Sequence, residues 1–130
     1  MFDWKKPTVQ MLGRWQPWHD GHTELFKRAL KKTGQVCIMY RDVEGVDAGV
    51  EGQADNPFGF EEVKKNIIVE LSKHNFEEGR DYVVIKVPNI IDISYGRGVG
   101  YSFTEHDLGK EIHAISATNI RKELRLKKEL

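Results

Sequence analysis

The sequence predicts an α/β domain, a three-layer α/β/α arrangement in which a mainly parallel sheet lies between two layers of helices. Short β-prone or apolar runs at 7–12, 35–40 and 81–87 alternate with two segments of helical periodicity. Strands separated by helices in this way form parallel sheets with right-handed crossovers. A chain of 130 residues with no internal repeat and no break in composition fits a single domain, 1–130.

The first strand and the first helix are expected on either side of a polar turn. PTVQML, at 7–12, is β-prone and ends at Gly13. From 22 to 32 the apolar residues fall on one face of a helix: Leu25, Phe26, Ala29 and Leu30. The turn between them, GRWQPWHDGH at 13–22, carries more polar side chains than a plain turn requires.

The middle of the chain predicts two more strands and a second helix. QVCIMY at 35–40 and DYVVIKV at 81–87 are nearly continuous apolar runs, as expected of strands that are buried on both faces. A helix is expected on the apolar stripe formed by Phe60, Val63, Ile67, Ile68 and Leu71. Residues 41–57, rich in glycine and acidic residues, are expected to form a long loop.

The last third of the chain predicts a short extended piece at 90–96, a final strand at 111–116 and a terminal helix at 118–130. A second polar turn, ISATNIR at 115–121, joins that strand to that helix. Ligands of open parallel sheets bind beyond the carboxyl ends of the strands. The two polar turns are therefore expected to open onto the same edge of the sheet.

Composition argues against several classes of function. Twenty basic residues balance twenty acidic ones, which argues against a nucleic-acid binder driven by counterion release. No apolar run has the length of a membrane span, and the N-terminus lacks the apolar stretch of a secretory signal. With one cysteine, Cys37, we expect a cytoplasmic protein with no internal disulfide and with no membrane or nucleic-acid partner.

The first polar turn has the composition of an anion-binding site. A helix that starts there presents unpaired backbone N–H groups to an anion, and His19 and His22 can place two imidazole donors beside it. Such donors stabilise charge that develops on a phosphoryl oxygen. Other interpretations stay open: Asp20 as a simple N-cap, a zinc site on the histidines that lacks a third clustered ligand, and Trp15 and Trp18 as core residues or pocket walls.

At these residues the chain resembles the HxGH nucleotidyltransferase superfamily. GRWQPWHDGH is similar to the motif GxFxPxHxGH, and ISATNIR is similar to the second motif, ISxTxIR. The resemblance implies a Rossmann-like fold and an enzyme that transfers a nucleoside monophosphate from ATP or CTP to a phosphorylated small-molecule acceptor. It also implies release of pyrophosphate, use of Mg²⁺, and a homodimer.

A third segment, NPFGFEEVKKNI at 56–67, resembles the NPFxxxER segment of archaeal-type nicotinamide mononucleotide adenylyltransferases. The RTxGISTT motif of the glycerol-phosphate cytidylyltransferases is missing, so adenylyl transfer is favoured over cytidylyl transfer. Where the adenylyltransferase segment has arginine, this chain has Val63 followed by Lys64. A charged contact has therefore been moved or lost.

The resemblance assigns roles to five residues of the two motifs. His19 and His22 would contact the triphosphate and its transition state, and Ser116, Thr118 and Arg121 would hold the β- and γ-phosphates. His19, His22 and Arg121 are therefore the predicted catalytic residues. No side chain is predicted as a metal ligand.

Further nucleotide-binding residues are expected around the first turn. Gly13 and Gly21 would let the backbone approach the triphosphate closely, Trp15 could wall the pocket, and Arg14 would supply positive charge. Arg41, after the second strand, would reach the same edge, with a solvated surface arginine as the alternative. Arg97 is a weaker candidate of the same kind.

The expected mechanism needs no general base, because an acceptor phosphate is already an anion. Its oxygen would attack the α-phosphorus in line, with alignment and charge neutralisation left to Mg²⁺, the histidines and the arginines. Acceptor contacts are expected from the loops at 42–57 and 89–107. The rival classes are an enzyme of the same fold with another acceptor, a nucleotide-binding module without chemistry, and a purely structural α/β protein.

Overall fold

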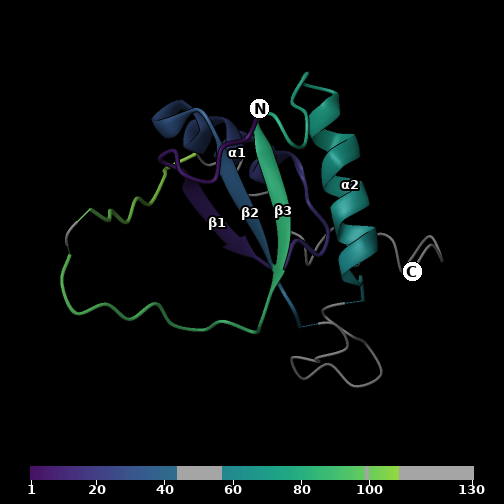
Figure 1. The fold of residues 1–130 in the computed structure, drawn as a ribbon. Helices are drawn as coiled ribbons and strands as arrows, with labels where there is room; N and C mark the ends of the chain where they lie inside the picture. Colours follow the sequence, from purple (N-terminus) through teal and green to yellow (C-terminus); the bar gives the residue numbers. More distant parts are fainter. Residues whose placement is uncertain (44–56, 99, 109–130) are drawn as a thin grey trace.

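The computed structural model describes residues 1–43, 57–98 and 100–108 (Figure 1). In order, it contains β1 (Val9–Gly13), α1 (Asp20–Thr33), β2 (Val36–Arg41), α2 (Phe60–Ser72) and β3 (Tyr82–Val87). All strand pairs are parallel, in the order β1-β2-β3. The predicted α/β class, the parallel sheet and the Rossmann-like arrangement of strand and helix are confirmed.

Both helices cover the same face of the sheet. On this face the register brings together Val9, Val36 and Tyr82, then Met11, Ile38 and Val84. From α1, the Phe26 ring lies edge-on to Tyr82 at 5.6 Å between ring centroids. From α2, the Phe60 ring lies 5.5 Å from Tyr40, which is on the same face. Right-handed crossovers that advance in one direction along a sheet place both helices on one side.

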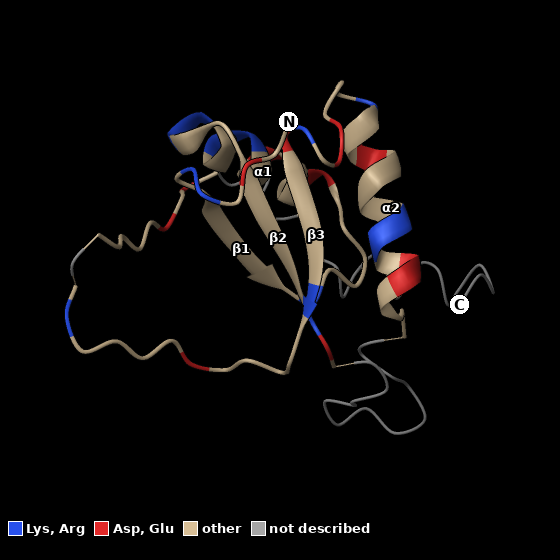
Figure 2. Ribbon diagram, in the orientation of Figure 1, with Lys and Arg blue, Asp and Glu red and all other residues tan. Residues whose placement is uncertain are grey.

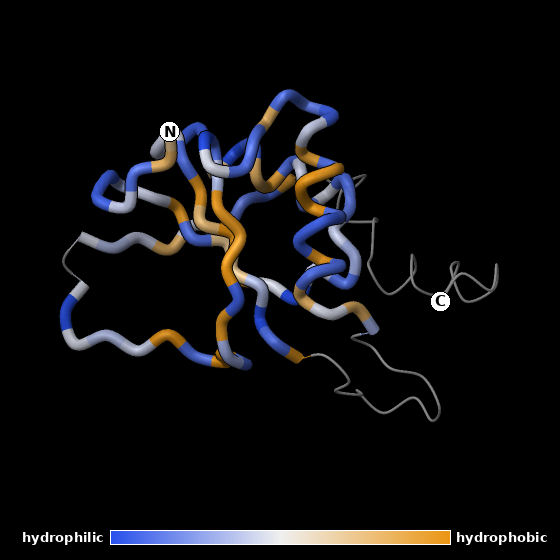
Figure 3. The backbone as a smooth tube through the Cα atoms, turned by 45° about the vertical axis from the view of Figure 1, so that its right-hand side comes forward, coloured by the Kyte–Doolittle hydropathy of each residue, from blue (hydrophilic) through white to orange (hydrophobic). Residues whose placement is uncertain are grey.

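The opposite face of the sheet is half-buried, so the prediction that β2 and β3 are buried on both faces is met on one face only. Burial alternates along both strands, with Cys37, Met39, Val83 and Ile85 half-buried. The described helices lie on the other face, which accounts for the alternation. Along the chain, the strands are mainly apolar, whereas the helices alternate between apolar and polar residues (Figure 3).

Two predicted elements lie outside the described residues: the last strand, 111–116, and the terminal helix, 118–130. The second helical layer therefore stays a prediction. Residues 90–96, predicted as a short extended piece, take no part in the described sheet. The segment after β3 runs away from the sheet and returns to α1 (Figure 1), where Arg28 Nη1 donates to the Asp107 carbonyl at 2.7 Å.

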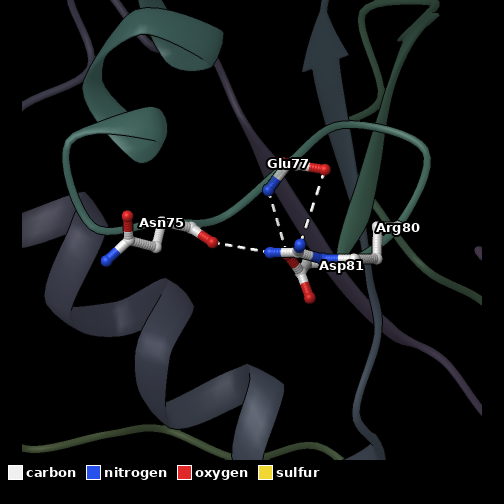
Figure 4. A network of polar contacts seen from close by, with 4 residues as sticks. All are labelled: Asn75, Glu77, Arg80 and Asp81. Atoms are coloured by element: carbon white, nitrogen blue, oxygen red, sulfur yellow. Dashed lines mark hydrogen bonds and ion pairs between the residues drawn. The ribbon is translucent and has the colours of Figure 1, made fainter.

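A polar network fixes the connection from α2 to β3 (Figure 4). Arg80 donates through Nη2 to the Asn75 carbonyl at 2.6 Å and pairs with Asp81 at 2.9 Å and Glu77 at 3.5 Å. The hydrogen bond to Asp81 is the main reason why the pKa of Arg80 is raised. Asn75 has a φ of +66°, a left-handed conformation that asparagine adopts more readily than most residues. The network thereby sets where β3 begins.

Charged residues lie mainly on the helices, the loops and the ends of strands, while the strands themselves are nearly free of charge (Figure 2). The carboxyl edge of the sheet is an exception, since Arg41 ends β2 and Lys86 lies near the end of β3. Lys86 Nζ is 3.5 Å from Asp42 Oδ2. Among the described residues, neither helix has the length and apolar character of a membrane span.

Candidate functional site

The turn between β1 and α1, residues 14–19, lies at the carboxyl edge of the sheet, as predicted. Trp15 fixes it there, because its indole Nε1 donates to the Met39 carbonyl of β2 at 3.0 Å. A Cβ added at Gly13 would lie 2.8 Å from the Trp15 ring, so only glycine leaves space for that ring. Gly13 was expected to make room for a polyphosphate, and the close neighbour that it accommodates in this structure is the indole.

His19 and His22 together start helix α1. The Nδ1 atom of His19, the N-cap residue, accepts from the Gly21 backbone N–H at 3.1 Å, and the His19 backbone N–H donates to His22 Nδ1 at 3.1 Å. This is the reciprocal geometry of a capping box. The alternative that Asp20 is the N-cap is wrong, because an imidazole nitrogen accepts the bond and Asp20 is the first helical residue.

These two bonds fix the proton positions on both rings. A neutral imidazole carries one proton, and a nitrogen that accepts a backbone N–H cannot carry it. The proton of each ring is therefore on Nε2, the side turned away from the backbone. The rings are stacked with centroids 3.7 Å apart and planes 19° apart. The turn thus presents two N–H donors side by side.

Burial keeps these donors neutral. It lowers the pKa of His22 to about 3, with a smaller contribution from the neighbouring His19. It also lowers the pKa of His19, against an opposing effect of Asp20. At neutral pH the His22 ring carries no charge, and the lowered pKa of His19 favours its neutral form. A neutral ring with its proton on Nε2 can donate a hydrogen bond to an anion without first gaining a proton.

The rings of two tryptophans, Trp15 and Trp18, pack against His22. The Trp15 ring stands edge-on to His22 at 4.8 Å between centroids, and the Trp18 ring is 5.4 Å from His22. Trp18 Nε1 donates to Thr23 Oγ1 at 2.8 Å. The two alternatives for these tryptophans both hold. They are 6% and 3% exposed within the core, and they also line a cavity of about 360 Å³ between the turn and α2.

Gln16 connects the turn to the start of α2, a role that the sequence did not reveal. Its side chain is almost fully buried, donates through Nε2 to the Phe58 carbonyl at 2.8 Å and accepts the Phe58 N–H on Oε1 at 2.9 Å. Tyr40 also donates to the Phe58 carbonyl, at 3.3 Å. A buried amide requires such partners. The only sign of this role in the sequence is a polar residue between Trp15 and Pro17. The residue to which it bonds lies 42 positions away, so local sequence does not identify it.

The three arginines predicted to supply positive charge to the site, Arg14, Arg41 and Arg97, differ in their surroundings. Arg14 is half-buried within the turn. Arg41 ends β2 and is also half-buried, with Nη1 3.5 Å from the Ile90 carbonyl. Its buried Nε has no hydrogen-bond partner in the described part of the chain. The alternative that Arg41 is a solvated surface residue is wrong, whereas Arg97 is exposed on the segment after β3.

Lys64, the cation that follows the arginine position of the third segment, pairs with an acidic side chain. Lys64 Nζ is 3.8 Å from Glu78 Oε2 and 5.9 Å from the centre of the Phe60 ring. Val63 is 2% exposed and lines the cavity beside Trp15. An apolar wall therefore stands where the resemblance leads one to expect a cation.

The second polar turn cannot be placed beside the first. Ser116, Thr118 and Arg121 lie outside the described residues, so the predicted convergence of the two turns stays a prediction. Gly21 lies in the first turn of α1, where its backbone N–H donates to Nδ1 of the N-cap residue His19. Within the described ranges, no group of three or more His, Cys, Asp or Glu side chains could hold a metal ion.

Comparison with known proteins finds one informative similarity. The chain is 32% identical over 81 residues to a nicotinamide-nucleotide adenylyltransferase from Methanococcus aeolicus. The match covers 62% of this chain and 41% of that relative, so the chain matches less than half of the relative's length. No protein-family model matches the chain, and no solved structure matches it either. The chain is thus distantly similar to a nucleotidyltransferase.

Proposed function

We propose that this protein is a nucleotidyltransferase that transfers a nucleoside monophosphate from a nucleoside triphosphate to a phosphorylated small molecule, with release of pyrophosphate. The observation that carries the proposal is the stacked pair of His19 and His22, whose Nδ1 atoms are both occupied by backbone N–H groups. AMP is the favoured group and ATP the favoured donor, in line with the similarity to an adenylyltransferase. CTP is the alternative donor.

The two histidines would act as hydrogen-bond donors to the phosphate chain. Negative charge grows on the α-phosphoryl oxygens and on the departing pyrophosphate as the α–β bond breaks. Donors that already point at that charge stabilise it without reorganising. The lowered pKa of His22 supports donation from a neutral ring, because no change of protonation state is required during turnover.

The reaction itself needs no base. An oxygen of the acceptor phosphate attacks the α-phosphorus, a new P–O bond forms, and the bond to the β-phosphate oxygen breaks with loss of pyrophosphate. Arg14 and Arg41, at the same edge, would bind phosphate oxygens through their guanidinium groups. Ser116, Thr118 and Arg121 would hold the β- and γ-phosphates, as the resemblance implies.

Magnesium would enter with the nucleotide. Mg²⁺ prefers oxygen ligands and is commonly held by substrate phosphates with few protein carboxylates. The described residues around the turn are mainly histidines, tryptophans and arginines, a set that suits a metal bound to the triphosphate and not to a protein cage. When bound, the ion would neutralise part of the triphosphate charge.

The test is release of pyrophosphate from each of the four NTPs with Mg²⁺ and a panel of acceptors: nicotinamide mononucleotide, glycerol 3-phosphate and phosphopantetheine. ATP is expected to give the highest rate, and only in the presence of an acceptor. Loss of one transition-state donor costs about a hundredfold or more. If His19→Ala and His22→Ala both remain within twofold of the parent, the histidines do not have this role. Nucleotide binding by calorimetry without any pyrophosphate would indicate a binding module.

A further inference from the structure

The segment before β1, residues 1–8, crosses the amino edge of the sheet, at the opposite end of the strands from the β1–α1 turn (Figure 1). The Phe2 backbone N–H donates to the Gly79 carbonyl, shortly before β3, at 2.7 Å. The Asp3 backbone N–H donates to Oε1 of Gln35, directly before β2, at 3.0 Å. These hydrogen bonds attach the segment beside the starts of two strands.

A buried glutamine holds the rest of the segment in place. The Gln35 side chain is 5% exposed. Its Nε2 donates to the Asp3 carbonyl at 2.6 Å and to Thr8 Oγ1 at 2.7 Å, with a longer bond of 3.4 Å to the Lys6 carbonyl. A buried amide requires such partners, and here one amide satisfies several positions of the segment. The intervening residues, Trp4 among them, are therefore held in a defined place.

Trp4 is exposed although the segment that carries it is ordered. Its side chain is 74% exposed, whereas Trp15 and Trp18 are 6% and 3% exposed. The half-buried Phe2 ring supports the indole edge-on, at 5.8 Å between ring centroids and 76° between planes. Burying a side chain of this size is favourable. A large ring that is held in water by an ordered segment indicates a contact outside the chain.

Four exposed lysines lie at the same edge as Trp4: Lys5, Lys6, Lys31 and Lys32. The first two belong to the segment, and the last two belong to the final turn of α1, which ends two residues before Gln35 (Figure 2). Within the described ranges none of the four forms an ion pair, whereas Lys64 and Lys86 each pair with a carboxylate. The acidic residue of the segment, Asp3, accepts the Lys5 backbone N–H at 2.9 Å. The amino edge therefore carries an excess of positive charge around an exposed ring.

We propose that this amino-edge patch, Trp4 with the four lysines, binds the surface of a membrane that contains anionic lipid. Lysines close to such a surface are attracted to it, and tryptophan rings prefer the headgroup region. Sites for single-stranded nucleic acid use several aromatic rings along a groove, commonly with arginine, whereas this patch has one exposed ring and lysines. The expectation from the sequence of no membrane partner considered a spanning segment, which surface binding does not require.

Binding at the amino edge would leave the β1–α1 turn accessible. All three described strands are parallel and run from the amino edge to the carboxyl edge, so the patch and the histidine pair lie at opposite ends of the sheet. A molecule held by the patch would keep His19 and His22 facing the solution. The proposal does not depend on the proposed function, because the patch and the turn share no residue.

The test measures binding to lipid vesicles by co-sedimentation and by tryptophan fluorescence. Vesicles of phosphatidylcholine alone are compared with vesicles of equal parts phosphatidylcholine and phosphatidylserine. Binding to the mixed vesicles is expected to be at least about tenfold tighter and to weaken as salt is added. Brominated lipid in the mixed vesicles is expected to quench the fluorescence of Trp4, since the other two tryptophans are buried.

Two exposed lysines provide a matched pair of variants. Lys6→Gln removes one charge from the patch and is expected to weaken binding to the mixed vesicles about fivefold. Lys65→Gln removes one exposed charge from α2 and is expected to change binding less than about twofold. Trp4→Ala is expected to weaken binding about tenfold and to abolish the quenching. The hydrogen bonds at position 6 are made by its backbone, so Lys6→Gln should melt with the parent.

The proposal would be overturned by equal binding to the two kinds of vesicle, by binding to neither, by mixed vesicles that do not quench Trp4, or by equal effects of Lys6→Gln and Lys65→Gln. Tighter binding to a thymidine oligonucleotide than to the mixed vesicles at the same salt would also overturn it, and would assign the patch to single-stranded nucleic acid. The vesicle assay contains no nucleoside triphosphate, so its failure leaves the proposed function untouched, and a chain that releases no pyrophosphate can still bind the vesicles.

Discussion

The two histidines of the turn have a structural task as well as the proposed chemical one, and a double substitution separates them. His19 and His22 form the capping box of α1, so replacing them with alanine removes the start of the helix together with the two donors. Serine at position 19 and glutamine at position 22 are the residues of a standard capping box. The variant His19→Ser/His22→Gln therefore keeps the helix start and lacks both imidazoles.

The expected stability changes follow from the two bonds. Loss of an N-cap side chain costs about 1 kcal/mol, and loss of the reciprocal hydrogen bond costs about 1 kcal/mol more. The double alanine variant is expected to be about 2 kcal/mol less stable than the parent, a fall of roughly 8 °C in Tm for a domain of this size. The Ser/Gln variant is expected to melt within about 2 °C of the parent.

Activity is expected to follow the other order. Both double variants lack the stacked pair of imidazole donors, so each should release pyrophosphate at least about a hundredfold more slowly than the parent. Calorimetric melting and the pyrophosphate assay on the same samples measure the two effects. A Ser/Gln variant that keeps more than a tenth of the parent rate would refute the role of the imidazole pair. A Ser/Gln variant that melts as low as the double alanine would refute the capping argument.

Three further predictions concern pH, the glycine before the turn and the buried glutamine. Burial lowers the pKa of His22 from 6.5 to about 3. Between pH 6.5 and pH 3 the unfolded chain therefore binds a proton at this histidine that the folded chain does not, and the free energy of unfolding falls as the pH drops through this range. Urea unfolding should show the parent losing about 1 kcal/mol more than His22→Gln between pH 6 and pH 5. Gly13→Ala, with a Cβ only 2.8 Å from the indole ring, should cost about 1–3 kcal/mol, whereas Gly96→Ala, with open space around it, should cost almost nothing; equal costs would contradict the close packing. Gln16→Leu leaves the Phe58 N–H without its acceptor and should cost about 2 kcal/mol in denaturant unfolding, and a loss below about 0.5 kcal/mol would show that water replaces the amide.

The elements of the fold were predictable where a single period dominates the sequence. The stripe of α2 predicted a helix from Phe60 that the structure ends at Ser72. Burial on one or both faces of β2 was not predictable, because VCIMY is apolar at every position and hides the alternation. The start of α1 was placed two residues late, since histidine is not among the residues preferred at N-caps.

The candidate site was predictable in its local part only. The HxGH pattern located His19 and His22, but neither the proton positions nor the support from Trp15 follows from spacing. The bond from Gln16 to Phe58 joins residues 42 positions apart, and no local pattern contains such a pairing. The second turn of the predicted site, at 115–121, stays a prediction.

Because one pair of side chains begins α1 and, in the proposed function, also contacts the triphosphate, natural variants of this turn should fall into two groups. A relative that has lost the activity cannot accept every residue at positions 19 and 22, because most replacements would remove the N-terminal capping of α1. We expect it to carry a hydroxyl, carboxyl or amide residue at 19 with glutamate or glutamine at 22. The residues at positions 19 and 22 would then distinguish inactive relatives from active ones.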